Sequence, residues 1–279
     1  MRPFAIPALL CALLLAHTAA AHAEWIVDAE GGAVYEDNLT RATLQADRRS
    51  DIALAPALTL GHYFQLTDAM SVLAAADFKA GLYPRFEGLS NLSSTVTLGV
   101  RHKLGLGGFA PWLRVSATAG ALDYGDNVRD SSVVAAAVQV GQRFSERFDL
   151  QGGYTYETLD ARNGVFDQDS HTFALKGNVA LTGAVQLTLG YSARLGDLVV
   201  HKAPVPGAAP APRSRLVNTF DTPLVAVRIN ATTHIFAAAA SYALTPHAAL
   251  NVGYEYQISI GPLFDYPNNL VRASFGYSF

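Results

Sequence analysis

Apolar residues alternate with polar or small ones over several long segments of this chain. In 92–104 one set of alternate positions is mostly apolar, and it comprises Leu92, Ser94, Val96, Leu98, Val100, His102 and Leu104. The other set is Ser93, Thr95, Thr97, Gly99, Arg101 and Lys103. The segments 187–195 and 250–260 repeat the pattern. A period of two indicates β-strands. Runs of about ten residues or more suit tilted membrane-spanning strands better than globular strands, whose usual length is about five or six residues.

Short and long connections alternate between these segments. The short turns are centred on Thr67-Asp68, Gly107-Gly108, Ser145-Glu146, Thr182-Gly183 and Thr245-Pro246. The longer, more polar connections are 37–50, 84–91, 125–130, 161–170, 196–223 and 261–268. Tight turns at one end and long loops at the other are typical of membrane β-barrels. An unpaired backbone group is costly in hydrocarbon, so the sheet must close on itself. The sequence therefore predicts an all-β, closed, antiparallel, up-and-down transmembrane barrel of about twelve strands, with both termini periplasmic.

The connection 196–223 is predicted to be one long extracellular loop. It contains Pro204, Pro206, Pro210 and Pro212 among alanines, and such a segment favours an extended conformation that cannot donate to a strand ladder. Two readings stay open, since the loop could be a flexible surface excursion or could fold inward and constrict a pore.

The first 23 residues have the layout of a cleaved secretory signal peptide. Arg2 supplies a positive start, 5–15 are apolar, and Ala21 and Ala23 are the small residues expected before a cleavage site. We therefore expect 24–279 to form a single barrel domain. Cys11, the only cysteine, falls within this leader, so no disulfide is expected.

The sequence contains no recognised catalytic or metal-binding motif. There is no His-Glu-x-x-His pair, no phosphate-binding glycine loop and no Gly-x-Ser-x-Gly elbow. The net charge of −3 includes no basic stripe that would indicate nucleic acid. Ser170-His171 beside Asp167 and Asp169 could form a hydrolytic cluster, but an acid-lined rim explains these residues as well. No enzyme activity, cofactor or metal is expected.

Aromatic residues gather near the predicted strand ends, where membrane barrels carry girdles at the lipid–water interfaces. On the turn side these are Trp25, Tyr63, Phe109, Trp112, Phe144, Phe148 and Tyr242. On the loop side they are Tyr35, Tyr83, Tyr124, Phe166, Phe264 and Tyr266. Each ring alone could be an ordinary core aromatic, but their placement at strand ends favours the girdles.

The last strand carries apolar and aromatic residues at alternate positions, Ala273, Phe275, Tyr277 and Phe279. This pattern resembles the C-terminal insertion signal of Gram-negative outer-membrane β-barrel proteins, and the opening segment 30–38 also resembles that class. The resemblance implies recognition by the barrel assembly machinery and residence in the outer membrane. The resemblance also implies contact with outer-membrane lipid and lipopolysaccharide. It does not indicate an oligomeric state.

The polar strand face is assigned to the lumen. It carries the basic candidates Lys79, Arg101, Lys103, Arg114, Arg143, Lys176, Arg194, Arg228 and Arg272. The acidic candidates are Asp28, Glu30, Glu36, Asp77, Glu157 and Glu255. Basic side chains lining a pore select anions, whereas cross-lumen pairing of the two sets would fill the barrel without transport.

Three functions are compatible with these observations. The first choice is a narrow porin-like channel for small polar or anionic solutes. The alternative is a non-conducting structural barrel that acts through its extracellular loops. A membrane-embedded lipid-modifying enzyme is the third, and it lacks a supporting motif.

Overall fold

The computed structural model describes residues 24–205, 207, 213–262 and 265–279. The predicted leader, Phe264 and three of the four loop prolines (206, 210 and 212) lie outside the described residues. The strands of the described chain are β1 (Glu24–Glu36), β2 (Asp51–Leu54), β3 (Ala57–Gln65), β4 (Met70–Gly81), β5 (Asn91–Lys103), β6 (Trp112–Tyr124), β7 (Ser131–Arg143), β8 (Phe148–Ala161), β9 (Gln168–Ala180), β10 (Val185–Lys202), β11 (Ser214–Val217), β12 (Leu224–Ala243), β13 (Ala248–Ile260) and β14 (Asp265–Ser278). Short 3₁₀ helices lie in three connections, η2 (Gln45–Asp47), η3 (Glu87–Leu89) and η4 (Asn127–Arg129).

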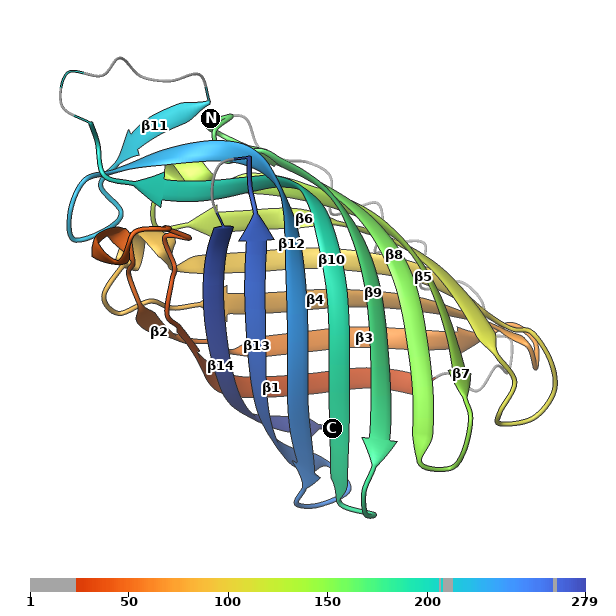
Figure 1. The fold of residues 1–279 in the computed structure, drawn as a ribbon. Coiled ribbons are helices and arrows are strands. Elements are labelled where there is room, and N and C mark those ends of the chain that lie inside the picture. The colour runs from red at the N-terminus through yellow and green to blue at the C-terminus, as the bar shows by residue number, and fades with distance from the viewer. Residues whose placement is uncertain (1–23, 206, 208–212, 263–264) are drawn as a thin grey trace.

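The sheet closes into a barrel (Figure 1). Neighbouring barrel strands pair antiparallel in chain order from β3 to β10, then β12, β13 and β14. The ring is completed by β1, which pairs with β3 on one side and with β14 on the other, where Asp28 lies opposite Ser278. The prediction of an all-β, closed, antiparallel barrel of twelve strands is thus confirmed, with β2 and β11 as additional short strands.

The strand β2 continues the line of β3 rather than adding to the ring. Ala33 of β1 pairs with Leu54, and Glu30 of β1 pairs with Ala57, so both segments hold the same register against β1. The interruption falls at Pro56, which has no backbone N–H to give to the ladder. The wall strand formed by β2 and β3 is therefore interrupted once, at Pro56.

Three of the five short turns share a local hydrogen bond that helps to define their position. The Thr67 hydroxyl accepts a hydrogen bond from the Met70 backbone N–H at 3.0 Å, and Thr182 and Thr245 do the same for the residue three positions on. Threonine and serine hydroxyls stabilise turns in this way. The end of the barrel that carries these turns is called the turn end, and the opposite end the loop end.

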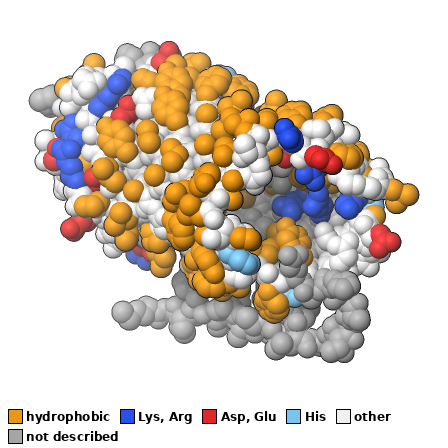
Figure 2. Space-filling view, turned by 90° about the horizontal axis from the view of Figure 1, so that it is seen from below, with side chains coloured by type: hydrophobic (Ala, Val, Ile, Leu, Met, Phe, Trp, Pro, Cys, Tyr) orange, Lys and Arg blue, Asp and Glu red, His pale blue; other side chains and the backbone are white. Residues whose placement is uncertain are grey.

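The outer wall is apolar and exposed to the surroundings. Leu98 and Val100 on β5 keep 49% and 44% of their surface accessible, and comparable leucine, valine and aromatic residues recur on the other barrel strands. Figure 2 shows hydrophobic side chains spread over the wall, and Lys and Arg side chains gathered around a hollow. No helix in the described chain is long and apolar enough to cross a membrane. Such a wall is suited to contact with lipid.

The predicted loop 196–223 starts too early. The strand β10 continues past Gly196 to Lys202 and stays paired with β12 throughout, and the short strand β11 pairs with β12 from the other side. Leu198, Val199 and Val200 are all buried. A strand buried on both faces has no alternation, and this explains why the pattern did not reveal it.

Candidate functional site

Two regions can bear on function: the polar inner face of the barrel and the packed connections at its loop end. The inner face is identified by alternation with the exposed apolar positions. On β5, for example, Thr97 lies between two outward positions, and its hydroxyl is 2.9 Å from that of Thr118 on β6. Residues at even steps from Thr97 share its face.

By this alternation the structure places most basic candidates on the inner face of the barrel strands. They are Lys79, Arg101, Lys103, Arg114, Arg143, Lys176, Arg194 and Arg272. Arg228 lies instead beyond the barrel wall, in the part of β12 that pairs with Val199. Its guanidinium is 3.6 Å from the Asp167 carboxylate and 4.0 Å from that of Asp197. Arg228 is therefore a structural part of the loop end.

The acidic candidates also lie at inner positions, namely Asp28, Glu30, Glu36, Asp77, Glu157 and Glu255. Several have nearby polar partners of their own. Asp77 accepts a hydrogen bond from Thr59 at 2.8 Å and lies 3.8 Å from Lys79 on the same strand. Glu36 accepts from the Asn268 amide at 2.7 Å. Among the described residues no ion pair crosses the lumen between the two candidate sets.

A basic group of the inner face lies near the turn end of β5 and β6. Arg101 is directly opposite Arg114 in the strand register. The Arg101 guanidinium lies 4.8 Å from the centre of the Trp112 ring, and Arg114 Nη2 donates to the Tyr63 hydroxyl at 3.2 Å. The Nε atom of Arg101 is buried and has no hydrogen-bond partner. Two neighbouring cations are thus held by aromatic side chains and not by carboxylates.

The expected aromatic girdles are wrong at several positions. Tyr63 and Trp112 on the turn side face the lumen, and Phe166 and Tyr266 on the loop side are buried in hydrophobic clusters. Trp112 shares a strand face with Arg114, and its indole lies over Gly141 of β7, where a side chain would overlap the ring. Trp25, by contrast, faces outward and packs edge-on against His62 at 4.6 Å. The parity of 112 with 114 was the signal in the sequence that could have identified Trp112 as a lumen residue.

A second polar region lines the inner face of β12, β13 and β14. It bounds a cavity of about 380 Å³ whose inward side chains include Glu30, Glu255, Arg272, Asn251 and Ser274. The Ser274 hydroxyl is buried without a partner. The cavity is lined by both acidic and basic side chains, so by itself it favours neither anionic nor cationic solutes.

The loop end is covered by connections that pack against one another, and this packed region is called the cap. Its apolar core consists of Phe86, Leu89, Val165, Phe166, Val199, Val217, Phe220, Leu224 and Ala226. These residues come from the β4–β5, β8–β9 and β10–β12 regions, which leave the wall at different points of the ring. Backbone and side-chain bonds add to it, since His201 N donates to Thr40 O at 2.8 Å and Thr219 donates to Asp126 at 2.9 Å.

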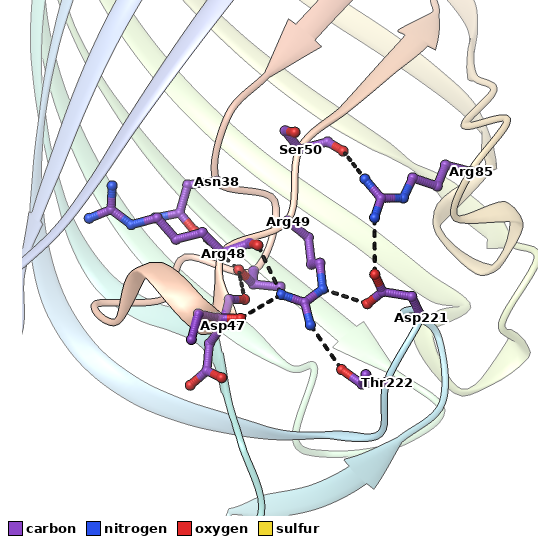
Figure 3. Close-up of polar contacts among 10 residues, drawn as sticks. Asn38, Asp47, Arg48, Arg49, Ser50, Arg85, Asp221 and Thr222 are labelled. Carbon is purple, nitrogen blue, oxygen red and sulfur yellow. Dashed lines mark hydrogen bonds and ion pairs between the residues drawn. The ribbon is translucent and has the colours of Figure 1, made fainter.

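An ionic clamp holds the β10–β12 connection to two others (Figure 3). Asp221 accepts hydrogen bonds from Arg49 of the β1–β2 connection and, at 3.0 Å, from Arg85 of the β4–β5 connection. Arg49 also donates to the Thr222 hydroxyl at 2.9 Å. The hydrogen bond from Arg49 lowers the pKa of the Asp221 carboxyl below its ordinary value. The cap was not predicted, because its contacts join residues far apart in the chain.

The packed connections at the loop end also bury a cation. Arg129 of η4 lies 4.3 Å above the Phe166 ring, and its Nη2 atom is 3.1 Å from His201 Nε2. Since arginine can only donate, His201 accepts here, and its Nδ1 atom is left to donate to Thr40 O at 3.2 Å. Burial lowers the pKa of Arg129 to about 10, so it keeps its charge at neutral pH.

The candidate hydrolytic cluster does not assemble. Ser170 is buried on the inner side of β9, whereas the adjacent His171 faces outward and pairs with the Tyr154 hydroxyl at 2.8 Å. Asp167 accepts from the Ala161 backbone at 2.9 Å and pairs with Arg228. In the described residues no group of three or more His, Cys, Asp or Glu is arranged to hold a metal ion.

The fold is shared with solved outer-membrane channels. The COG4313 outer membrane channel from Pseudomonas putida F1 aligns with a TM-score of 0.62 at 13% sequence identity, over 91% of this chain and 96% of that chain. The KdgM porin in complex with disordered oligogalacturonate aligns with a TM-score of 0.51 at 7% identity, over 91% of this chain and 99% of that chain. The sequence matches no protein-family model and no curated protein. The barrel fold of this chain is thus that of Gram-negative outer-membrane channels.

Proposed function

We propose that the chain is an outer-membrane channel that passes small anionic solutes. The observation that carries this proposal is the inner-face basic group at the turn end, where Arg101 faces Arg114 with no carboxylate partner among the described residues. A pore lined by unpaired cations lowers the barrier for anions and raises it for cations. The non-enzymatic reading is supported by the separation of Ser170 from His171 on opposite strand faces.

The orientation and the assembly route form part of the same proposal. The turn end and both chain ends of the barrel would face the periplasm, and the loop end would face outward beside lipopolysaccharide. The assembly machinery would read the outward residues of the last strand, Ala273, Phe275, Tyr277 and Phe279, of which Phe279 keeps 75% of its surface accessible.

The test is ion selectivity in a planar bilayer under a salt gradient. The wild-type reversal potential should show anion preference. Replacing Arg101, Arg194 and Arg272 together by Gln should move it towards the non-selective value. The effect should be largest at low salt, because the screening length is about 30 Å at 0.01 M. A charge-matched control replaces Arg147, Arg162 and Arg215, which lie in a turn, in a connection and on β11 outside the lumen, and it should keep the preference.

One observation favours a second candidate, a non-conducting barrel that acts through its loops. The cap packs a hydrophobic core across the loop end, and a permanently closed cap would block passage. Folded protein that shows no conductance at any voltage would favour this candidate and would contradict the channel proposal.

A further inference from the structure

We infer that Arg101 and Arg114 form a binding site in the lumen for the oxyanion group, a carboxylate or a phosphate, of a small solute. This inference deepens the proposed channel function, because it names the chemical group that would be recognised on the way through.

The register puts the two side chains next to each other on one face. Directly opposite residues in an antiparallel pair have Cβ atoms about 5 Å apart, and like charges at such a pair destabilise the sheet. Arg101 and Arg114 form such a pair. Their repulsion is relieved when an anion lies between them.

No side chain in the same row can supply that anion. The row continues to Ser71 on β4 and to Gln139 on β7, and neither carries a negative charge. The acidic candidate on β4, Asp77, is six positions from Ser71, which is about 20 Å along the strand. Lys103, on the same face as Arg101, adds a further positive charge.

The two guanidinium groups are also held in place. Trp112 underlies Arg101, and Tyr63 accepts a hydrogen bond from Arg114 Nη2. Arg101 Nε remains without a partner in a buried position. A guanidinium presents its donors in a planar fork that suits two oxygen atoms of one oxyanion, whereas chloride cannot use this geometry. The site should therefore distinguish oxyanions from halides.

Trp112 provides a direct measurement of binding. The chain has two tryptophans, so in a Trp25→Phe protein the fluorescence reports on the ring beneath Arg101. Titration of the detergent-folded protein with sodium acetate, and separately with sodium phosphate, should give a saturable change in Trp112 fluorescence. Sodium chloride at equal ionic strength should give none. Arg114→Gln should weaken the apparent affinity by about tenfold or more, as the loss of a charge-assisted hydrogen bond predicts, and Arg147→Gln in the β7–β8 turn should leave it unchanged.

A change in fluorescence that follows ionic strength equally for chloride, acetate and phosphate would overturn the inference. So would equal affinities in wild type and Arg114→Gln, provided that both proteins shift on heating in gels as folded barrels do. The channel proposal can fail separately from the binding site. Saturable binding without conductance would support the oxyanion site and contradict the channel. Anion-selective conductance without saturable binding would support the channel and contradict the oxyanion site.

Discussion

Phe86 and Phe220 meet edge-to-face with ring centres 5.2 Å apart, although they belong to connections that leave the barrel wall on different sides of its loop end. Both rings are almost fully buried. Edge-to-face aromatic contacts stabilise by about 0.5–1.5 kcal/mol beyond the area they bury. This contact belongs to the apolar core of the cap and joins two of its connections.

Phe220→Ala should loosen the cap while leaving the barrel intact. Truncating a buried phenylalanine costs about 3–5 kcal/mol, and here the loss falls on the connections. We expect faster proteolytic cleavage between β10 and β12 and a larger or noisier conductance. Leu216→Ala, in the same region but 58% exposed, is the matched control. Identical cleavage of the two variants would show that Phe220 does not hold the cap.

Asp221→Asn should release the ionic clamp at neutral pH, because both Arg49 and Arg85 lose their shared carboxylate. In the wild type the pKa of Asp221 is lowered from 3.8. Its contribution is therefore fully present above about pH 3.8 and is lost as the pH falls through the lower folded value. The cap of the wild type should stay protease-resistant at pH 5 and open only in stronger acid.

The same clamp experiment has an internal control. Asp68→Asn removes a carboxylate from the β3–β4 turn at the opposite end of the barrel, and it should not alter cap proteolysis at any pH. If Asp221→Asn behaves like Asp68→Asn, the clamp contributes nothing measurable, as is common for exposed ion pairs.

Gly141→Val should disturb the lumen site without removing a charge. A side chain at 141 would overlap the Trp112 indole, so the ring must move and Arg101 loses its support. We expect a shifted Trp112 emission and weaker oxyanion binding in the Trp25→Phe background. Gly183→Val, in a turn with open space around it, is the control, and equal spectra for the two variants would contradict the packing described.

Phe279→Asp should reduce the amount of protein recovered in outer membranes, because it places a charge at the outward end of the last strand. Phe279→Tyr keeps an aromatic ring and should retain near wild-type levels. Quantification in membrane fractions measures the effect, and unchanged recovery of the Asp variant would mean that the last strand is read in another way.

The barrel was predictable because its strands and turns are encoded by patterns among neighbouring residues. Alternation placed a strand over 92–104, and β5 spans Asn91–Lys103. The threonine turns are likewise defined by a few adjacent residues. The cap has no such signal, since Phe86 and Phe220 are joined only by tertiary packing. The extension of β10 through Leu198 and Val200 was missed for a related reason, because burial of both its faces hides any period of two.

The positive charge of the lumen is unevenly distributed along the barrel axis. Arg101, Lys103, Arg114 and Arg143 lie towards the turn end, whereas the packed connections of the cap lie at the loop end. A conduit with more fixed charge at one mouth than at the other accumulates ions under one polarity and is depleted of them under the reverse polarity. The current–voltage curve should therefore be asymmetric, and the direction of this rectification reports which way each molecule has inserted into the bilayer.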